Sequence, residues 1–187
     1  MKNYELLPAP SSVTLVKFNP AAFTANLVCF EETDPDAVIA FNANYFDPKT
    51  KAPIGWFRMR KWVQIGAITG PQPRPYFEFC GVVVQAGPTL FEDGNPDWGW
   101  RLYSENEKFR PDAIRKASHN AIGETEHKKV VVGHFPNHTL DQIAETMRKH
   151  CVSAMKCDGG GSAYLKVDQL IRGERLYCGV ELREKRK

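Results

Sequence analysis

The chain has 187 residues, of which 42% are apolar and 25% are charged. This length suits a single domain, and the composition excludes a disordered or low-complexity chain. The net charge of +3 favours anionic ligands only weakly. The sequence carries neither a zinc-finger pattern nor an RNA-binding motif. We therefore expect one domain over residues 1–187 that does not bind nucleic acid.

The cysteines and the N-terminus bear on cellular location. The five cysteines are widely spaced and include no Cys-x-x-Cys pair, which argues against a metal knuckle. The N-terminal residues lack the apolar run of a signal peptide. No segment approaches the roughly 20 apolar residues of a membrane span. These features predict a cytoplasmic protein with five free thiols and no membrane partner.

Short apolar runs rich in β-branched and aromatic residues predict strands along the chain. In order, they cover residues 13–18, 26–30, 37–41, 79–85, 129–133 and 154–157, with weaker patterns at 162–167 and 176–180. Proline and glycine signals predict loops at residues 69–75 and 92–100.

One helix is predicted between two of these strands. Apolar residues recur at helical spacing from Leu140 to Cys151, and Thr139 with Gln142 forms a capping box at the start. The strand–helix–strand unit over residues 130–157 is compatible with a parallel crossover. The whole pattern predicts an α+β fold, with a curved mixed β-sheet and helices packed on it.

The segment Asp158–Ser162, Asp-Gly-Gly-Gly-Ser, carries the strongest chemical signal. Three glycines are costly in a regular element, but they let backbone N–H groups approach a ligand closely. The flanking carboxylate and hydroxyl add an acid or base and a donor. A plain glycine turn is the alternative. The P-loop and dinucleotide-binding patterns are both absent.

Three other segments place polar residues beside predicted strands. Asn42–Asp47 follows an apolar run, although a turn formed by Asn and Asp-Pro is the commoner explanation of such a segment. Gln85–Leu90 indicates a strand that ends in a tight turn. His119–Gly123 contains a histidine able to move a proton near neutral pH.

In this order, the four segments resemble the motifs of the phosphodiester glycosidase family. That family's pattern is Asn-Gly-Gly-(Tyr or Phe)-Phe, Gly-Pro-x-Leu with a later Gly, Arg-Thr-Ala-Ile-Gly, and Leu-Asp-Gly-Gly-Gly-Ser. This sequence offers Asn42–Phe46, Gly87–Leu90 with Gly94, Asn120–Gly123 and Asp158–Ser162. The resemblance spans roughly residues 38–166.

The sequence also departs from the family pattern. Ala43 and Asn44 stand where the first motif has two glycines, and the arginine of the third motif is missing. His119 occupies the place two residues before Ala121, and Arg115 is the nearest upstream arginine. Histidine does not replace the permanent planar fork of an arginine. The change therefore implies weaker phosphate binding or another substrate.

The resemblance implies hydrolysis of a sugar 1-phosphodiester to a free sugar and a phosphomonoester, through an oxocarbenium-like state. Asp158 is the expected base or electrostatic stabiliser, His119 the general acid, and Asp47 the candidate second carboxylate. The expected ligand contacts come from Asn44, Tyr45, Asn120, Gly159, Gly160, Gly161 and Ser162. No cofactor or metal is expected.

Two other classes stay open at this stage. The domain can instead be a module that binds or sequesters a phosphorylated sugar or nucleotide-type ligand without turnover, which the missing arginine motivates. It can also be a structural domain, although polar, glycine-rich strand ends are poor core material.

Overall fold

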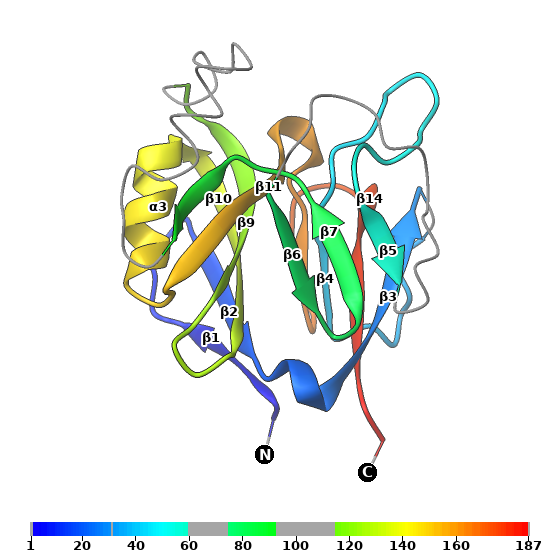
Figure 1. Cartoon of the computed structure of the whole chain (residues 1–187), viewed down its shortest axis with the longest axis horizontal. Helices are drawn as coiled ribbons and strands as arrows, with labels where there is room; N and C mark the ends of the chain where they lie inside the picture. The colour runs from blue at the N-terminus through cyan, green and yellow to red at the C-terminus, as the bar shows by residue number, and fades with distance from the viewer. Residues whose placement is uncertain (1, 31, 60–74, 93–114, 187) are drawn as a thin grey trace.

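The computed structural model describes residues 2–30, 32–59, 75–92 and 115–186. The predicted loops at 69–75 and 92–100 and the motif glycine Gly94 lie almost entirely outside these ranges. No helix in the described ranges is long and apolar enough to cross a membrane. Among these residues the chain forms three sheets, in which every strand pair is antiparallel, and a single α-helix (Figure 1).

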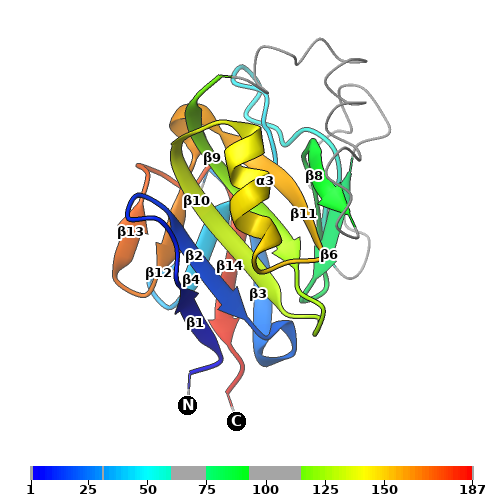
Figure 2. The same ribbon diagram turned by 90° about the vertical axis from the view of Figure 1, so that its left-hand side faces the viewer.

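A six-stranded sheet forms one layer of the molecule. Its strands, in spatial order, are β1 (Tyr4–Leu7), β2 (Thr14–Phe18), β10 (Val130–His138), β9 (Ala117–Glu124), β11 (Ser153–Gly159) and β8 (Thr89–Glu92). The helix α3 (Leu140–Arg148) joins β10 to β11 and lies on the outer face of this sheet (Figure 2). Because β10 and β11 both pair antiparallel with β9, they run parallel to each other, as the crossover prediction requires.

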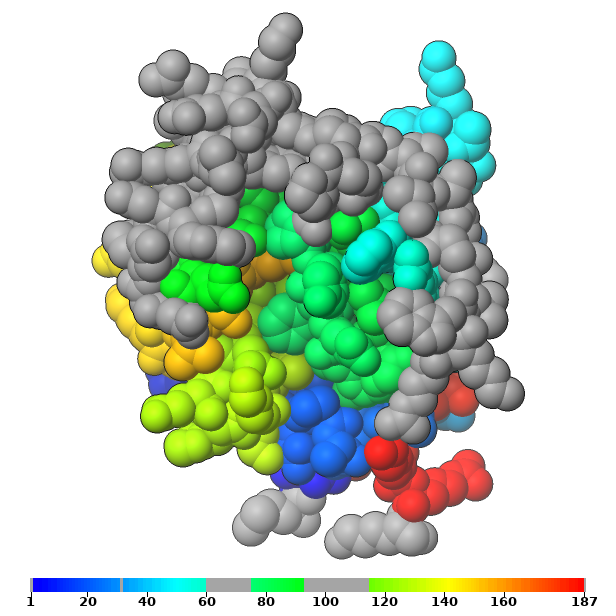
Figure 3. All heavy atoms as spheres, viewed as in Figure 1, coloured from blue at the N-terminus to red at the C-terminus, as the bar shows by residue number. Residues whose placement is uncertain are grey.

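Two smaller sheets pack on the other face. The five-stranded sheet has the order β13 (Leu170–Arg172), β12 (Leu165–Val167), β4 (Ile39–Asn42), β14 (Cys178–Glu184) and β3 (Phe23–Cys29). The three-stranded sheet has the order β5 (Phe57–Met59), β7 (Val82–Gln85) and β6 (Tyr76–Phe79), and the green β6–β7 hairpin lies near the centre of the face seen in Figure 3. Two short 3-10 turns, η1 (Pro20–Ala22) and η2 (Gly160–Ser162), complete the elements.

The main core lies between the sheets. Phe18 and Ile122 of the six-stranded sheet share one buried cluster with Phe41, Val84 and Val180 of the other two sheets. A second cluster lies beneath the helix, where Ile143 and Met147 pack on the outer face of the six-stranded sheet. This sheet is therefore covered on both faces, which explains the unbroken Val-Val-Val run that begins β10.

The fold class predicted from the sequence is wrong. The described chain is mostly β, and its layers are antiparallel sheets packed on one another rather than a mixed sheet covered by helices. Sheet-on-sheet contact buries most of the apolar strand faces, and α3 covers only the outer face of one sheet.

The local predictions fared unevenly. The helix is confirmed, with its capping box formed by Thr139 and Gln142. The single strand predicted over residues 79–85 is wrong, because Cys80 and Gly81 both have positive φ and turn the chain into the hairpin between β6 and β7. A positive φ at two central residues is what a tight two-residue hairpin loop requires.

The prediction of five free thiols is also wrong. Cys29 and Cys178 are directly opposite each other on β3 and β14 and form a disulfide across 149 residues of sequence. Cys80, Cys151 and Cys157 are free. The cytoplasmic location stays a prediction.

Candidate functional site

The glycine-rich segment lies where β11 ends and η2 begins (Figure 1). The ladder between β9 and β11 shifts register between Lys156 and Gly159, so Asp158 lies at a β-bulge. Bulges commonly re-aim a side chain beside a functional site. Asp158 is joined to the first motif segment as well, because its N–H donates to the Ala43 carbonyl at 3.1 Å.

Asp158 is a buried carboxylate with one oxygen that the described residues leave without a partner. Its Oδ1 accepts the Gly159 N–H at 2.8 Å, whereas Oδ2 has no hydrogen-bond partner in the described part of the chain. Burial raises the pKa of this carboxyl from 3.8 to about 6, although Lys156, the Gly159 N–H and the Ser162 hydroxyl each lower it. A carboxyl with this pKa exchanges a proton near neutral pH, which is typical of functional groups.

The next two glycines border open space. A Cβ built on Gly160 or Gly161 meets no atom of the described residues within 4 Å, and Gly160 has a φ of +68°. Gly159 is different, because its Cβ would lie 2.7 Å from Nδ1 of His119. The segment therefore offers room for a ligand beside Gly160 and Gly161, while Gly159 is needed for close packing of β11 on β9.

His119 lies on β9 opposite Gly159, with both ring nitrogens buried and unpartnered among the described residues. Burial, then the charges of Lys156 and Arg115, lower the pKa of His119 to about 3. The imidazole is thus neutral at pH 7. This argues against the predicted general-acid role, and it leaves a neutral ring that can donate or accept one hydrogen bond.

Successive side chains of β9 point to opposite faces of the six-stranded sheet, so neighbouring residues have different roles. Ala121 packs in the cluster beneath α3 and Ile122 in the core between the sheets, so His119 faces the helix side and Asn120 faces inward. The Asn120 amide donates to the carbonyls of Asn42 and Tyr164, at 3.0 and 2.6 Å. It therefore links the sheets, and a contact with substrate stays a prediction.

In the first motif segment, the asparagine side-chain amides form hydrogen bonds with backbone groups of other segments. The Asn44 amide donates to Ile54 and Trp56 carbonyls at 3.1 and 3.0 Å and accepts the Gln85 N–H at 3.1 Å. Asn42 donates to the Ser162 and Arg175 carbonyls, so it positions the glycine segment. Sequence reasoning assigned Asn44 to the ligand, and the structure shows the amide fully committed to protein atoms.

Asp47 lies in the turn after this segment. Its carboxylate accepts the Lys49 N–H at 2.7 Å, and hydrogen bonds from Lys49 and Thr50 hold its pKa below the ordinary value. Neither Asp47 nor Asp158 contributes to the pKa shift of the other. The geometry favours a turn-capping role, as Asx turns require, over the predicted second catalytic carboxylate.

Lys156 is the residue that sequence reasoning missed. It is buried on β11, two residues before Asp158, and its Nζ donates to the Tyr45 hydroxyl at 2.8 Å and to the Cys157 carbonyl at 2.9 Å. The Tyr45 hydroxyl in turn donates to the Gly87 carbonyl. A lysine within the apolar run at residues 154–157 was the only signal in the sequence.

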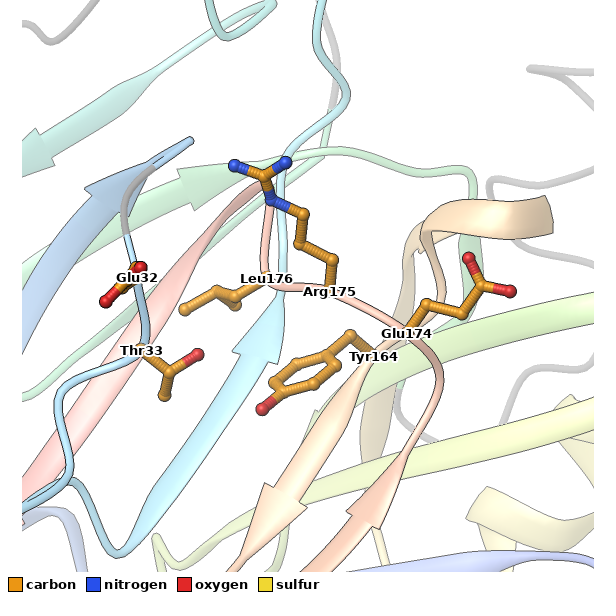
Figure 4. A pocket seen from close by; sticks show the side chains of 6 residues that line it. All are labelled: Glu32, Thr33, Tyr164, Glu174, Arg175 and Leu176. Carbon is orange, nitrogen blue, oxygen red and sulfur yellow. The ribbon is translucent and has the colours of Figure 1, made fainter.

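One pocket opens elsewhere. It measures about 370 Å³ and is lined by Glu32, Thr33, Tyr164, Glu174, Arg175 and Leu176 (Figure 4). Tyr164 and Leu176 cluster with Val28 and Ala40 on the outer face of the five-stranded sheet, away from the core between the sheets. None of the predicted catalytic residues lines this pocket, and the chemistry gathers around Asp158 instead.

The described residues contain no group of three or more His, Cys, Asp or Glu that could hold a metal ion. Comparison with known proteins adds the family. The model of the phosphodiester glycosidase family matches residues 35–177. The chain belongs to this family. The match includes all four motif segments, and it agrees with the resemblance read from them.

Two solved structures share the fold of this phosphodiester glycosidase family member. One is the zebrafish N-acetylglucosamine-1-phosphodiester alpha-N-acetylglucosaminidase catalytic domain, auto-inhibited by its pro-peptide. It has a TM-score of 0.75 and 13% identity, covering 98% of this chain and 83% of that one. The other is a hypothetical protein from Synechocystis, with a TM-score of 0.69 and 12% identity, covering 97% and 61%. No curated protein matches the sequence.

Proposed function

We propose that this protein hydrolyses a sugar 1-phosphodiester, releasing a free sugar and a phosphomonoester. The observation that carries the proposal is Asp158, a buried carboxylate with one oxygen unpartnered within the described ranges, next to the space that these residues leave open at Gly160 and Gly161. The chain belongs to the phosphodiester glycosidase family, and the similar zebrafish domain is named for cleavage of an N-acetylglucosamine 1-phosphodiester.

The chemistry assigned to each group follows from the bond that breaks. Cleavage between the anomeric carbon and the phosphate oxygen leaves positive charge on the sugar and negative charge on the departing phosphate. The Asp158 carboxylate stabilises the sugar cation or accepts a proton from the attacking water. The N–H groups of Gly160 and Gly161, with the Ser162 hydroxyl, receive the phosphate oxygens.

The replacement of the family arginine by a neutral His119 favours one alternative, a module that captures a phosphorylated sugar or nucleotide-type ligand without turnover. The two functions differ in a measurable way. A panel of glycosyl 1-phosphodiesters, headed by the methyl phosphodiester of N-acetylglucosamine, should yield free sugar with the enzyme. Binding by calorimetry without any product would support the capturing module.

The position of cleavage needs its own test. In water enriched with oxygen-18, breakage at the anomeric carbon leaves the phosphomonoester unlabelled, whereas attack at phosphorus places one labelled oxygen on it. Phosphorus NMR distinguishes these products by the isotope shift. Label in the phosphomonoester would contradict a glycosidase mechanism and indicate a phosphodiesterase.

A further inference from the structure

The pocket shown in Figure 4 is built from residues that have no part in the proposed hydrolysis. It measures about 370 Å³, near the lower end of the range for small-molecule pockets, roughly 300–1,000 Å³. Three parts of the chain line it. They are Glu32 and Thr33 after β3, Tyr164 just before β12, and the run Glu174–Leu176 before β14.

Backbone contacts fix the walls of this pocket. The Asn42 amide donates to the Arg175 carbonyl at 3.0 Å and also to the Ser162 carbonyl, so one side chain holds the pocket wall next to the glycine segment. Gly173 has a φ of +84°, and a Cβ built on it would collide with the Ala163 carbonyl oxygen. Only glycine lets the two segments approach this closely. The pocket is therefore preformed rather than a gap between loosely packed loops.

Tyr164 and Leu176 form an apolar floor. They are 5% and 2% exposed, and they cluster with Val28 and Ala40 of the five-stranded sheet. The Tyr164 hydroxyl forms no hydrogen bond with the described residues, and Figure 4 shows it on the side of the ring that faces Thr33. The floor thus offers a ligand an apolar surface with one hydroxyl at its edge.

Charged side chains of both signs surround this floor. Glu32 and Glu174 are negative, and Arg175 is positive. Within the described part of the chain, none of the three takes part in an ion pair, although they line one pocket. The Arg175 guanidinium donates to the Phe30 carbonyl at 3.4 Å and lies 5.8 Å from the centre of the Tyr177 ring. Both partners are neutral, so they orient the guanidinium without cancelling its charge.

This combination of charges selects among classes of ligand. The two carboxylates repel a simple anion, and the guanidinium repels a simple cation. A neutral sugar gains only ordinary hydrogen bonds, which are roughly half as strong as those between charged partners. A zwitterion gains on both sides, because its ammonium donates to the carboxylates while its own carboxylate accepts the parallel N–H bonds of the guanidinium.

We propose that this pocket binds a free α-amino acid with an apolar side chain. Glu32 and Glu174 receive the ammonium, Arg175 receives the carboxylate, and the side chain of the ligand lies on Tyr164 and Leu176. The inference is independent of the proposed hydrolysis, because it concerns a second site and is tested by binding alone.

The first test measures the binding of L-leucine, L-methionine and L-phenylalanine to the whole chain by calorimetry. At least one of them should bind with a millimolar or lower Kd. Two analogues of the tightest binder are then compared with it: the N-acetyl derivative, which lacks the ammonium, and the corresponding amine, which lacks the carboxylate. Each should bind about tenfold more weakly, as loss of a charge-assisted hydrogen bond predicts.

The second test assigns each charge to a side chain. Arg175→Gln should weaken binding of the amino acid about tenfold but should not weaken binding of the amine, which has no carboxylate to lose. The double variant Glu32→Gln, Glu174→Gln should weaken binding of the amino acid by a similar factor and spare the N-acetyl derivative. Arg186→Gln and Glu126→Gln change exposed charges outside the pocket, so they serve as matched controls that should leave binding unchanged.

Three results would overturn the inference. They are the absence of binding by all three amino acids, equal binding of the amino acid and both analogues, and binding that survives both Arg175→Gln and the double glutamate variant. Thermal unfolding first shows that each variant is folded. A wild-type protein that binds an amino acid but cleaves no phosphodiester would uphold this site and remove the hydrolase, whereas turnover without amino-acid binding would do the reverse.

Discussion

Two motif segments of this protein place polar residues at the ends of strands and differ in how they use those polar groups. In the segment around Asn44, the amide donates and accepts within the protein, and no part of it is left over for a ligand. In the segment around Asp158, one carboxylate oxygen and the facing His119 ring nitrogens have no partner among the described residues. Unpaired buried polar groups are costly, so their concentration in one place indicates function.

The comparison is tested most strongly at Asp158. Asp158→Asn keeps the size of the side chain and removes the charge that the proposed mechanism needs. We expect turnover to fall by roughly two orders of magnitude or more, with phosphate binding retained. Steady-state kinetics on the phosphodiester panel measures the fall. Full turnover by a folded Asp158→Asn variant would mean that Asp158 is not the catalytic carboxylate.

A matched control is available in Asp47→Asn. The Asp47 carboxylate accepts N–H bonds within its own turn and has a lowered pKa. We expect turnover to stay near the wild-type rate. A loss as large as that of Asp158→Asn would restore Asp47 as the second carboxylate.

In the segment around Asn44, we expect a substitution to reduce stability rather than activity. Asn44→Ala leaves the Gln85 N–H and the Ile54 and Trp56 carbonyls without their partner. At about 1 kcal/mol for each lost hydrogen bond, the free energy of unfolding should fall by about 3 kcal/mol. Urea denaturation measures it, with the exposed Asn26→Ala on β3 as a control expected to change little. A stable Asn44→Ala variant with poor substrate binding would reverse the assignment.

The pH dependence of kcat/KM tests whether the ionised form of Asp158 is the active one. The pKa of Asp158 is about 6 and that of His119 about 3, so of these two groups it is Asp158 that titrates between pH 4 and pH 7. If the carboxylate is the active form, kcat/KM should fall about tenfold per pH unit below pH 6. A profile that is flat from pH 7 to pH 5 would contradict a catalytic role for the ionised carboxyl.

The same titration affects stability with the opposite sign. The folded state binds a proton at Asp158 that the unfolded state has released, so this contribution to stability falls as pH rises from about 4 to about 6. Asp158→Asn should lack this pH-dependent contribution, and at pH 7 it should be more stable than the wild type by roughly 3 kcal/mol. Thermal unfolding of the two proteins across this pH range gives the difference.

The smallest expected effects concern the glycines. Gly161→Ala places a methyl group in open space without backbone strain, so stability should hold while ligand affinity falls. Gly160→Ala should cost about 1 kcal/mol more, because a φ of +68° disfavours any residue with a Cβ. Calorimetric binding and thermal unfolding separate the two effects. Unchanged affinity in Gly161→Ala would show that the ligand does not occupy this space.

Local signals made part of this structure predictable. The α3 boundaries follow from Thr139 and Gln142, which act within one helical turn. The strands β2 and β10 follow from their apolar runs. The strand β9 was missed, because Asn120 and His119 interrupt its apolar pattern, and only the inter-sheet acceptors explain an asparagine facing the core.

Contacts between residues far apart in the chain could not be predicted from the sequence. The partner of Cys29 lies 149 residues away, and no local pattern identifies it. In the site, Asp158 and the glycines stood out because the motif is local. Lys156 did not, since its meaning depends on Tyr45, which is 111 residues distant. Asp47 was predicted to be catalytic because a catalytic carboxylate at a strand end and a turn-capping aspartate share one sequence pattern. The structure shows the turn-capping aspartate.

The two ends of the described chain lie together at one pole of the molecule, while η2 and the glycine segment lie at the opposite pole (Figure 1). This arrangement decides how the protein can be attached to a surface or to another protein. A tether at either terminus leaves the glycine segment on the side away from the attachment, so immobilised protein or a fusion at either end should keep the candidate site free.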